Sequence, residues 1–111
     1  MEPLKKPNPR IGPEAKIQSE IEFALRGREW YVKSTHGNMY QSGFPDIYAY
    51  HKKHGQRWIE VKYKEHYVFT PAQLENFPMM SAFGIGIWIL VSADQNELQK
   101  LFQPPNWHLY L

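Results

Sequence analysis

Two short segments of the sequence carry side chains that could do chemistry together. The first ends in Pro45-Asp46, and the second is Glu60-Val61-Lys62. Side chains alternate between the two faces of a strand, so Glu60 and Lys62 project to one side while Val61 projects to the other. If Asp46 begins a neighbouring antiparallel strand, its carboxylate approaches Glu60, although the sequence does not fix the register. The segments therefore predict two carboxylates and one ammonium group on a small surface.

Two adjacent carboxylates repel each other unless a cation lies between them or one of them holds a proton. A hard divalent ion such as Mg²⁺ meets this need, because it prefers octahedral oxygen ligands and keeps several waters. We expect Asp46, Glu60 and the backbone carbonyl of Val61 to bind the ion, with water and a phosphate oxygen as further ligands. Such an ion polarises a phosphodiester and lowers the pKa of an attacking water. Lys62 would orient that water or stabilise charge on the phosphate.

A Glu-x-Lys triplet alone is typical of an ordinary polar strand face. The preceding Pro-Asp and the distribution of charge favour a site here. Residues 33–64 carry a net charge of +4, against +1 for residues 1–32 and −3 for residues 65–111. This surplus is modest beside that of dedicated DNA-binding domains, and ordinary solvated surface explains it equally well. The charge agrees with a polyanionic substrate without establishing one.

The strands that would position these residues follow from β-type runs between turn residues. Residues 30–34 form the first run, and a loop rich in Gly, Ser, Asn and Gln follows over residues 35–43. Strands are predicted at residues 45–50 and 57–64, joined by a polar connection short enough for an antiparallel hairpin. Residues 85–91 are almost continuously apolar, which indicates a strand that is buried on both faces and central in the sheet.

Three helices are predicted around these strands. Apolar residues recur every three or four positions over residues 13–28, which is the spacing of an amphipathic helix. A second helix is expected to begin after Thr70 and to run toward Gly84, with a break or kink at Pro78. A short third helix is expected over residues 94–102, before an aromatic tail.

The element order α, β, β, β, α, β, α predicts an α/β fold. We expect one domain over residues 12–111, with a mixed four-stranded sheet and an αβββαβ core flanked by helices. A chain of 111 residues leaves little room for a second core. Residues 1–11 contain three prolines and lack periodicity, so we expect a loose basic arm whose Lys5, Lys6 and Arg10 could contact phosphates.

The composition excludes several classes of site. The sequence has no cysteine, which rules out disulfides, thiolate zinc sites and a cysteine nucleophile. No run of eighteen apolar residues is present, and residues 1–10 lack the apolar centre of a secretory signal. We therefore expect a soluble cytoplasmic protein with no membrane partner and no small-molecule cofactor.

Three segments, in this order along the chain, resemble the motifs of a known family. They are Ser42-Gly43-Phe44-Pro45-Asp46, Trp58-Ile59-Glu60-Val61-Lys62 and Thr70-Pro71-Ala72-Gln73, preceded by a helix that carries acids. The chain resembles the PD-(D/E)xK nuclease superfamily, and within it the small VRR-NUC proteins related to Holliday-junction resolvases, over about residues 14–91. The resemblance implies a restriction-endonuclease-like fold, binding of Mg²⁺ or Mn²⁺ by the Asp and the Glu, and assistance to catalysis by the Lys.

The family usually adds an acid from the first helix, and two candidates compete here. On a helical wheel Glu14 lies about 35° from the centre of the apolar stripe and Glu20 about 85° from it. Glu14 is therefore better aimed at the sheet, and it matches the family's Glu-x-x-Ile-Gln pattern through Ile17 and Gln18. We favour Glu14 as the catalytic acid and keep Glu20 as the alternative. Either acid could instead serve only as favourable charge near a helix N-terminus.

Several polar residues near these motifs are further candidates. Gln73 resembles the glutamine that these proteins place near the active site, yet it also occupies the third helical position of a possible capping box with Thr70. Both roles stay open. The residues that lead into Asp46 include amides, hydroxyls and cations, which are common donors to nucleic-acid phosphates and bases. They are Lys33, His36, Asn38, Tyr40, Gln41 and Ser42, each of which could also be an ordinary loop residue.

Histidines and aromatic residues give weaker signals. His51, His54, His66 and His108 lack the spacing of metal ligands on one helix. Most aromatic rings are expected in the core, Trp88 above all, although one or two exposed rings could stack on unpaired bases.

The sequence thus predicts a Mg²⁺-dependent endodeoxyribonuclease, with Mn²⁺ as a substitute for Mg²⁺, that acts on DNA and is selective for branched, flap or junction structures. Because related resolvases cut two strands symmetrically, we expect a homodimer. The alternative is a non-catalytic DNA-binding module that keeps the nuclease fold. A protein-interaction adaptor that uses the aromatic tail ranks last, because it leaves the motifs unexplained.

Overall fold

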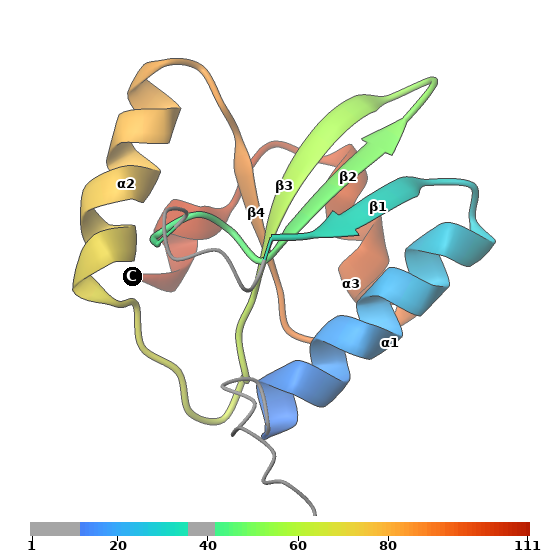
Figure 1. Cartoon of the computed structure of the whole chain (residues 1–111), viewed down its shortest axis with the longest axis horizontal. Coiled ribbons are helices and arrows are strands. Elements are labelled where there is room, and N and C mark those ends of the chain that lie inside the picture. Colours follow the sequence, from blue (N-terminus) through green and yellow to red (C-terminus); the bar gives the residue numbers. More distant parts are fainter. Residues whose placement is uncertain (1–11, 36–41) are drawn as a thin grey trace, which may run out of the picture.

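A four-stranded mixed sheet forms the centre of the molecule, and helices lie on both of its faces (Figure 1). The computed structural model describes residues 12–35 and 42–111. The order of helices and strands is the predicted one. The strands are β1 (Tyr31–Ser34), β2 (Ile47–His51), β3 (Gly55–Val61) and β4 (Ile87–Leu90), and the helices are α1 (Pro13–Gly27), α2 (Pro71–Ala82) and α3 (Gln95–Leu98), with the 3-10 turns η2 (Gln99–Phe102) and η3 (Trp107–Tyr110).

The sheet confirms the predicted hairpin and fixes its register. β1 and β2 are antiparallel, β2 and β3 are antiparallel, and β3 and β4 are parallel. Ile47 pairs with Ile59 across the hairpin. β3 ends at Val61 rather than at residue 64, and β2 begins at residue 47 rather than 45. The main chain at Pro45 and Asp46 binds Thr35 instead of continuing the β2–β3 ladder.

The apolar strand β4 is buried on both faces, as predicted, but it is not central. The strand order is β1-β2-β3-β4, which places β4 at an edge of the sheet. The prediction failed because apolar residues report which faces are covered and not which edges are paired. The side chain of Asn106 occupies the outer edge, where it accepts from the Ile89 amide at 2.6 Å and donates to the Ile89 carbonyl at 3.2 Å. An amide side chain thus satisfies backbone groups that another strand would otherwise bind.

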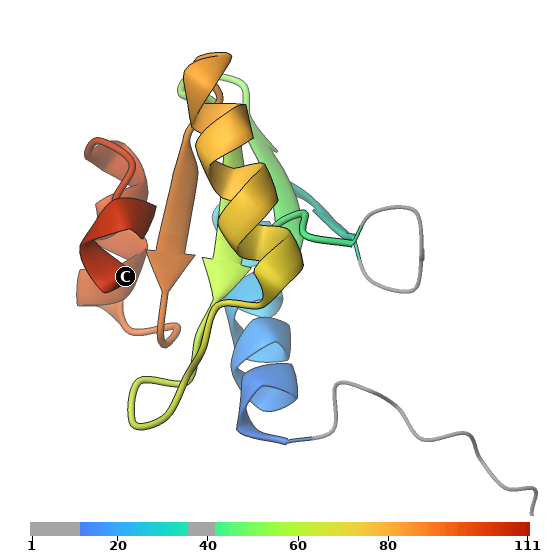
Figure 2. The ribbon, with the colours of Figure 1, turned by 90° about the vertical axis from the view of Figure 1, so that its left-hand side faces the viewer.

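Two apolar clusters fill the layers on either side of the sheet. On one face Ile21 and Leu25 of α1 pack against Ile47, Ile59 and neighbouring strand residues, and α3 and η2 complete this layer. On the other face, α2 and η3 cover β4, through a cluster of Phe77, Met80, Ile87, Ile89 and Trp107. Figure 2 shows α2 crossing in front of the sheet, with α1 behind it.

Helix α2 continues through Pro78 to Ala82, so the predicted break there is wrong. Its end is fixed by Gly84, whose φ of 84° allows the amides of Gly84 and Ile85 to bind the carbonyls of Ser81 and Met80. This pair of bonds is a Schellman ending, which favours glycine at the left-handed position. Within residues 12–35 and 42–111, no helix combines the length and the apolar character that crossing a membrane demands.

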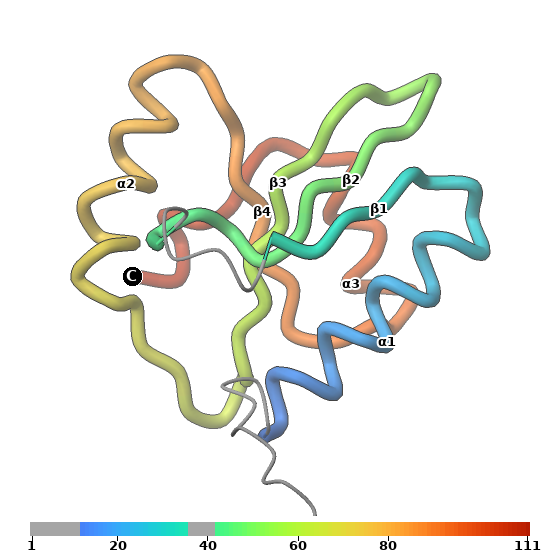
Figure 3. Tube along the Cα trace, viewed as in Figure 1, coloured from blue at the N-terminus to red at the C-terminus, as the bar shows by residue number. Residues whose placement is uncertain are grey.

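The two ends of the sheet differ in what lies beside them. The trace in Figure 3 shows the N-terminal end of α1 next to the segment that leaves β3, at the end of the sheet opposite to the β2–β3 hairpin turn. The N-terminus of α2 faces the same region. The predicted Asp46, Glu60 and Lys62 all lie at this end, where three elements converge on them.

Candidate active site

Asp46 is fixed by bonds to both its main chain and its side chain. Its Oδ2 accepts a hydrogen bond from the Val61 amide at 2.8 Å. The Thr35 amide donates to the Asp46 carbonyl at 2.9 Å, and the Thr35 hydroxyl donates to the Pro45 carbonyl. Since Ile47 pairs with Ile59, Asp46 stands one position further along the hairpin, opposite Glu60. The register that the sequence left open therefore brings the two predicted carboxylates together.

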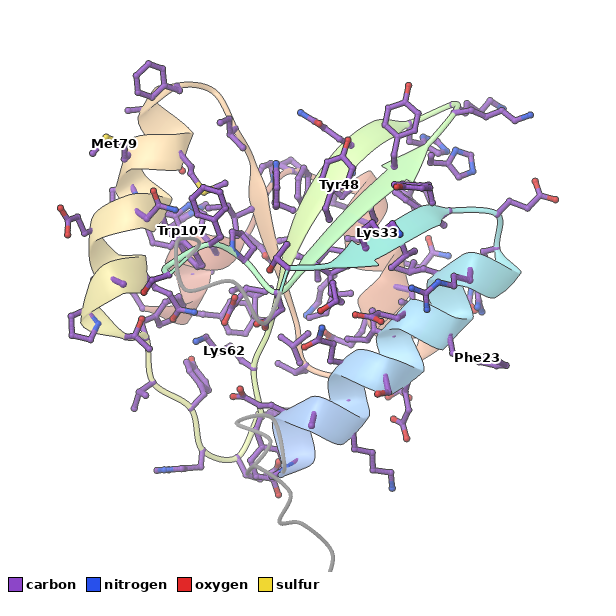
Figure 4. The ribbon with its side chains drawn as sticks, in the orientation of Figure 1. Phe23, Lys33, Tyr48, Lys62, Met79 and Trp107 are labelled. Atoms are coloured by element: carbon purple, nitrogen blue, oxygen red, sulfur yellow. The ribbon has the colours of Figure 1, made fainter. Side chains whose placement is uncertain are left out.

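Glu60 and Lys62 form a buried ion pair on the α2 side of β3. The Lys62 Nζ lies 3.2 Å from the Glu60 Oε2. It also donates to the Val68 carbonyl at 2.7 Å and to the Gln73 Oε1 at 3.0 Å, and it lies 4.5 Å from the centre of the Phe69 ring. Figure 4 shows Lys62 between the end of β3 and the start of α2. These contacts hold the ammonium group in one place.

Gln73 caps α2 and also contacts the charged residues of β3. The backbone amide of Gln73 donates to the Thr70 hydroxyl, and the side-chain Oε1 of Gln73 accepts from the backbone amide of Thr70, each at 3.1 Å. These two bonds complete the predicted capping box. The same side chain donates from Nε2 to the Glu60 Oε2 at 2.8 Å and accepts from Lys62. The α2 N-terminus is thereby joined directly to the two charged residues of β3.

The charged side chains of Asp46, Glu60 and Lys62 are almost completely buried from solvent. Asp46, Glu60 and Lys62 are only 5%, 3% and 3% exposed. Burial, and secondly the negative charge of Asp46, raises the pKa of Glu60 to about 8, against the opposing effect of Lys62. The Glu60 Oε1 is buried and has no hydrogen-bond partner among residues 12–35 and 42–111. A carboxylate in this setting either holds a proton or requires a cation, because an ionised oxygen without a partner is costly to bury.

The donor set fits a hard divalent cation. Two carboxylates face each other, and the unpartnered Glu60 Oε1 is the atom that an ion would satisfy. The Lys62 amide binds the Leu90 carbonyl on the β4 side, so the amide and carbonyl of the preceding Val61 point to the other side, toward Asp46. Within residues 12–35 and 42–111, no group of three or more His, Asp or Glu side chains converges. Mg²⁺ keeps several waters and is commonly held by one or two carboxylates, so a pair suffices.

The structure distinguishes the two candidate acids of α1. The Glu14 Oε2 accepts from the Tyr63 amide at 3.3 Å, just beyond the end of β3, and the residue is half-buried. Glu20 is exposed. Glu14 therefore faces the site end of the sheet, as the helical wheel indicated, but it does not join Asp46 and Glu60 in one metal-binding group.

The segment before Asp46 is pressed against the start of α2. Gly43 has a φ of 85°, and a Cβ at this position would lie 2.7 Å from the Ala72 carbonyl oxygen. The Asn76 side chain donates to the Gly43 carbonyl at 3.1 Å. Only glycine fits both the backbone conformation and the close approach. The Gly43-Phe44-Pro45-Asp46 segment thus owes its path to glycine as well as to proline.

The structure describes two of the residues predicted to contact nucleic acid. Lys33 is exposed on β1, and Ser42 is exposed beside α2, where it borders a hollow with Ala72 and Asn76. Both are accessible to a ligand. The remaining candidates, His36, Asn38, Tyr40 and Gln41, lie outside the described residues.

Sequence reasoning missed three supporting groups. Thr35 fixes the main chain at Asp46, the Val68 carbonyl binds Lys62, and the Phe69 ring lies against the same ammonium group. No motif marks them: Thr35 follows β1 outside the three motif segments, and Val68 and Phe69 lie in the connection between β3 and α2. Their proximity arises from the fold.

A comparison with solved structures identifies the architecture. The chain matches a structure described as a VRR_NUC domain with a TM-score of 0.64 and 18% sequence identity, over 84% of this chain and 98% of that chain. No protein-family model matches the sequence, and no curated protein does. The chain therefore has the fold of a VRR_NUC domain, which agrees with the restriction-endonuclease-like α/β fold that the sequence resemblance implied.

Proposed function

We propose that this protein is a divalent-metal-dependent endonuclease that hydrolyses phosphodiester bonds in DNA. The observation that carries the proposal is the buried pair of Asp46 and Glu60, with Lys62 at 3.2 Å from Glu60. The VRR_NUC fold supports it, because the three residues lie in motifs that resemble those of the same nucleases. A purely structural cluster has little use for two facing carboxylates, one of which leaves an oxygen without a partner.

Mg²⁺ is the proposed ion, and Mn²⁺ would substitute for it. Asp46 and Glu60 would bind it through carboxylate oxygens, and Val61 through its backbone carbonyl. When bound, a divalent ion polarises the phosphoryl group, lowers the pKa of a water and neutralises charge on the leaving oxygen. Glu60 must lose its proton to bind a cation, so its raised pKa couples metal binding to pH.

Lys62 has a distinct proposed role. Its ammonium group is held by the Val68 carbonyl, Gln73 and Glu60, so its charge is in place before substrate arrives. A preorganised cation in a site that excludes water stabilises developing negative charge more strongly than the same cation in solvent. We propose that Lys62 acts on the phosphate undergoing hydrolysis, and that Gln73 positions both Lys62 and Glu60.

The proposed substrate is DNA with a branch, flap or junction. Selectivity for such a structure is proposed to come from the residues around the site. We also propose a homodimer, because two sites related by twofold symmetry would cut two strands of one substrate.

The test is cleavage of labelled duplex, flap and four-way-junction DNA with Mg²⁺, with Mn²⁺ and with EDTA. We expect metal-dependent products from the intact protein and a loss of at least about a hundredfold in rate for Asp46→Ala and Lys62→Ala. Asp94→Ala is the matched control, because Asp94 is an exposed acid at the start of α3, which packs in the layer of α1 on the opposite face of the sheet.

Two results would reject the proposal. One is cleavage by Asp46→Ala and Lys62→Ala at the rate of the intact protein. The other is binding of DNA without cleavage of any substrate in either metal, which would identify a binding module that keeps the nuclease fold. Circular dichroism of each variant separates a lost site from a lost fold.

A further inference from the structure

On the side of the sheet that carries Glu60 and Lys62, the described residues 12–35 and 42–111 place α2 and η3 over β4 and no helix over β1 and β2 (Figure 1). On this side, alternate residues of β1, β2 and β3 form two rows across the strands. In the first row Tyr31 pairs with Tyr50, which pairs with Gln56; in the second Lys33 pairs with Tyr48, which pairs with Trp58. We call this surface the open face; its residues are Tyr31, Lys33, Tyr48, Tyr50, Gln56 and Trp58.

The open face is rich in exposed aromatic rings. Tyr31 is 56% exposed and Tyr50 is 45% exposed, and Phe44 at the border is 37% exposed. The ring centres of Tyr48 and Trp58 lie 5.0 Å apart. The Phe44 ring contacts the Trp58 ring edge-on, with 6.0 Å between the ring centres. The opposite side of the same strands is buried under α1, so Tyr31, Tyr48 and Tyr50 are not part of that core, whereas Trp58 is half-buried against the α2-side cluster. A contiguous apolar patch of this kind marks an interaction surface more often than single exposed rings do.

The charge of the open face suits a polyanion. Lys33 is exposed in the second row, and its Nζ lies 5.9 Å from the centre of the Tyr31 ring. In the sequence from residue 30 to 59, Asp46 is the sole acidic residue. The hairpin turn beyond the first row carries the exposed Lys52 and Lys53.

The open face is continuous with the candidate active site. Thr35 binds the Asp46 main chain, and Asp46 stands opposite Glu60, so these residues form the third row on the same strands. Successive rows on one face are about 7 Å apart, because each residue advances a strand by about 3.4 Å. The Lys33-Tyr48-Trp58 row therefore lies directly beside the row of Asp46 and Glu60. Figure 4 shows Lys33 and Tyr48 of this row on the neighbouring strands β1 and β2.

We propose, on the basis of the nuclease function proposed above, that the open face binds an unpaired single strand of DNA and leads it to the carboxylates. Bases stack on the rings of Tyr48, Tyr31 and Tyr50, because every base has a flat face that an aromatic side chain can contact. Lys33 contacts a phosphate of the same strand. A flap or the single-stranded arm of a branch supplies such a segment, and a blunt duplex does not.

A second copy of the chain is the competing occupant of this surface. If two open faces packed against each other around a twofold axis, the Lys33 side chains of both copies would lie in one interface. The open face carries no acidic side chain to balance their positive charge. A nucleic-acid strand supplies the opposite charge. We therefore assign the surface to DNA, and the oligomeric state of the variants is measured in the same experiment.

The test is equilibrium binding without cleavage. A fluorescently labelled oligothymidylate and a blunt duplex of equal length are titrated with the full chain in EDTA, and anisotropy is recorded at several salt concentrations. We expect the single strand to bind more tightly. Tyr48→Ala and Tyr31→Ala should each weaken single-strand binding by roughly 5- to 150-fold, while Tyr48→Phe, which keeps the ring, restores it. Lys33→Gln should reduce the slope of log affinity against log salt by about 0.7.

Phe23→Ala is the matched control, since Phe23 is an exposed ring, 82% accessible, on α1, which covers the opposite face of the sheet. Equal affinities of Tyr48→Ala, Tyr31→Ala and the intact protein would overturn the inference, as would equal losses in Tyr48→Ala and Phe23→Ala. Conversion of a dimer to a monomer by Tyr48→Ala in ultracentrifugation would assign the surface to a second copy. Tight single-strand binding without metal-dependent cleavage would reject the nuclease function and leave the binding surface intact.

Discussion

Glu14 and Glu20 show how one side-chain orientation separates a site residue from a surface residue. Glu14 accepts the Tyr63 amide beside the site, whereas Glu20 is exposed. Glu14→Gln keeps the hydrogen-bonding shape and removes the charge. We expect it to lower kcat/KM for DNA cleavage by about 10- to 100-fold, as changes to groups that support metal ligands do. Glu20→Gln is the control and should change kcat/KM by less than about twofold. Equal effects of the two substitutions would remove Glu14 from the site.

Glu60 predicts a pH dependence of folding stability in the metal-free protein. Its pKa in the folded state is raised from 4.5 to about 8. The folded state therefore holds this proton more tightly than the unfolded state does, so the stabilisation is complete below about pH 4.5 and is lost as the pH rises toward 8. Urea unfolding in EDTA should show a free energy of unfolding that falls by a few kcal/mol across this range.

Glu60→Gln isolates this contribution, because its side chain has the same shape and stays neutral. The difference in the pH dependence of unfolding between the two proteins measures the Glu60 titration. Parallel curves for the intact protein and Glu60→Gln would mean that Glu60 titrates normally.

At the residue scale, the sequence predicted the site side chains better than their supports. Alternation along one strand was enough to place Glu60 beside Lys62, because a strand has only two faces. The double role of Gln73 could not be chosen from the sequence, since the capping box depends on local spacing and the contact with Glu60 depends on how α2 docks on the sheet. Thr35 could not be identified from the sequence, because its contacts with Pro45 and Asp46 depend on how β1 pairs with β2.

At the scale of elements, Gly43 and Gly55 form a natural comparison. Both have a φ of 85°, but a Cβ at Gly43 would collide with the Ala72 backbone while one at Gly55 would meet nothing within 4 Å. Both alanine variants suffer the cost of a left-handed conformation, about 1–2 kcal/mol. Gly43→Ala adds the collision, so urea unfolding should show a further loss of about 1–3 kcal/mol, and cleavage should fall with it. Equal losses at the two positions would show that the close approach to α2 is unimportant.

The edge of β4 predicts a second difference between matched residues. Asn106 binds both the amide and the carbonyl of Ile89, whereas Asn96 is exposed on α3. Asn106→Ala leaves two buried backbone groups without partners, and we expect a loss of about 1–3 kcal/mol in the free energy of unfolding. Asn96→Ala should stay within about 0.5 kcal/mol of the intact protein. A stable Asn106→Ala variant would indicate that another group covers this edge.

The elements themselves were largely predictable because each has a local cause. Helix α1 follows from its apolar spacing, α2 from its capping box, and the β2–β3 hairpin from its short polar turn. The predicted central position of β4 was wrong, because the strand lies at an edge of the sheet. An apolar run does not reveal that Asn106, sixteen residues beyond Leu90, takes the place of a neighbouring strand. Pro78 was misjudged because packing of Phe77 and Met80 holds α2 together on both sides of it.

At the scale of the whole molecule, the sequence predicted the architecture that the VRR_NUC structure confirms. The sequence could not predict that the open face lies next to the carboxylates of Asp46 and Glu60. The open face and the carboxylates meet because the Tyr48–Trp58 pair lies one row from Asp46 and Glu60 in a sheet whose register only the fold determines. The proposed recognition surface and the candidate active site are thus parts of one continuous strand face.

The proposed binding of a divalent ion by Asp46 and Glu60 is measured most directly by calorimetric titration with Mn²⁺ near pH 8. The intact protein should bind about one ion per chain, and Asp46→Asn should lose this binding while keeping its fold. Asp94→Asn should bind as the intact protein does. Absence of heat from the intact protein, or equal binding by Asp46→Asn, would contradict the assignment of these carboxylates as a metal site.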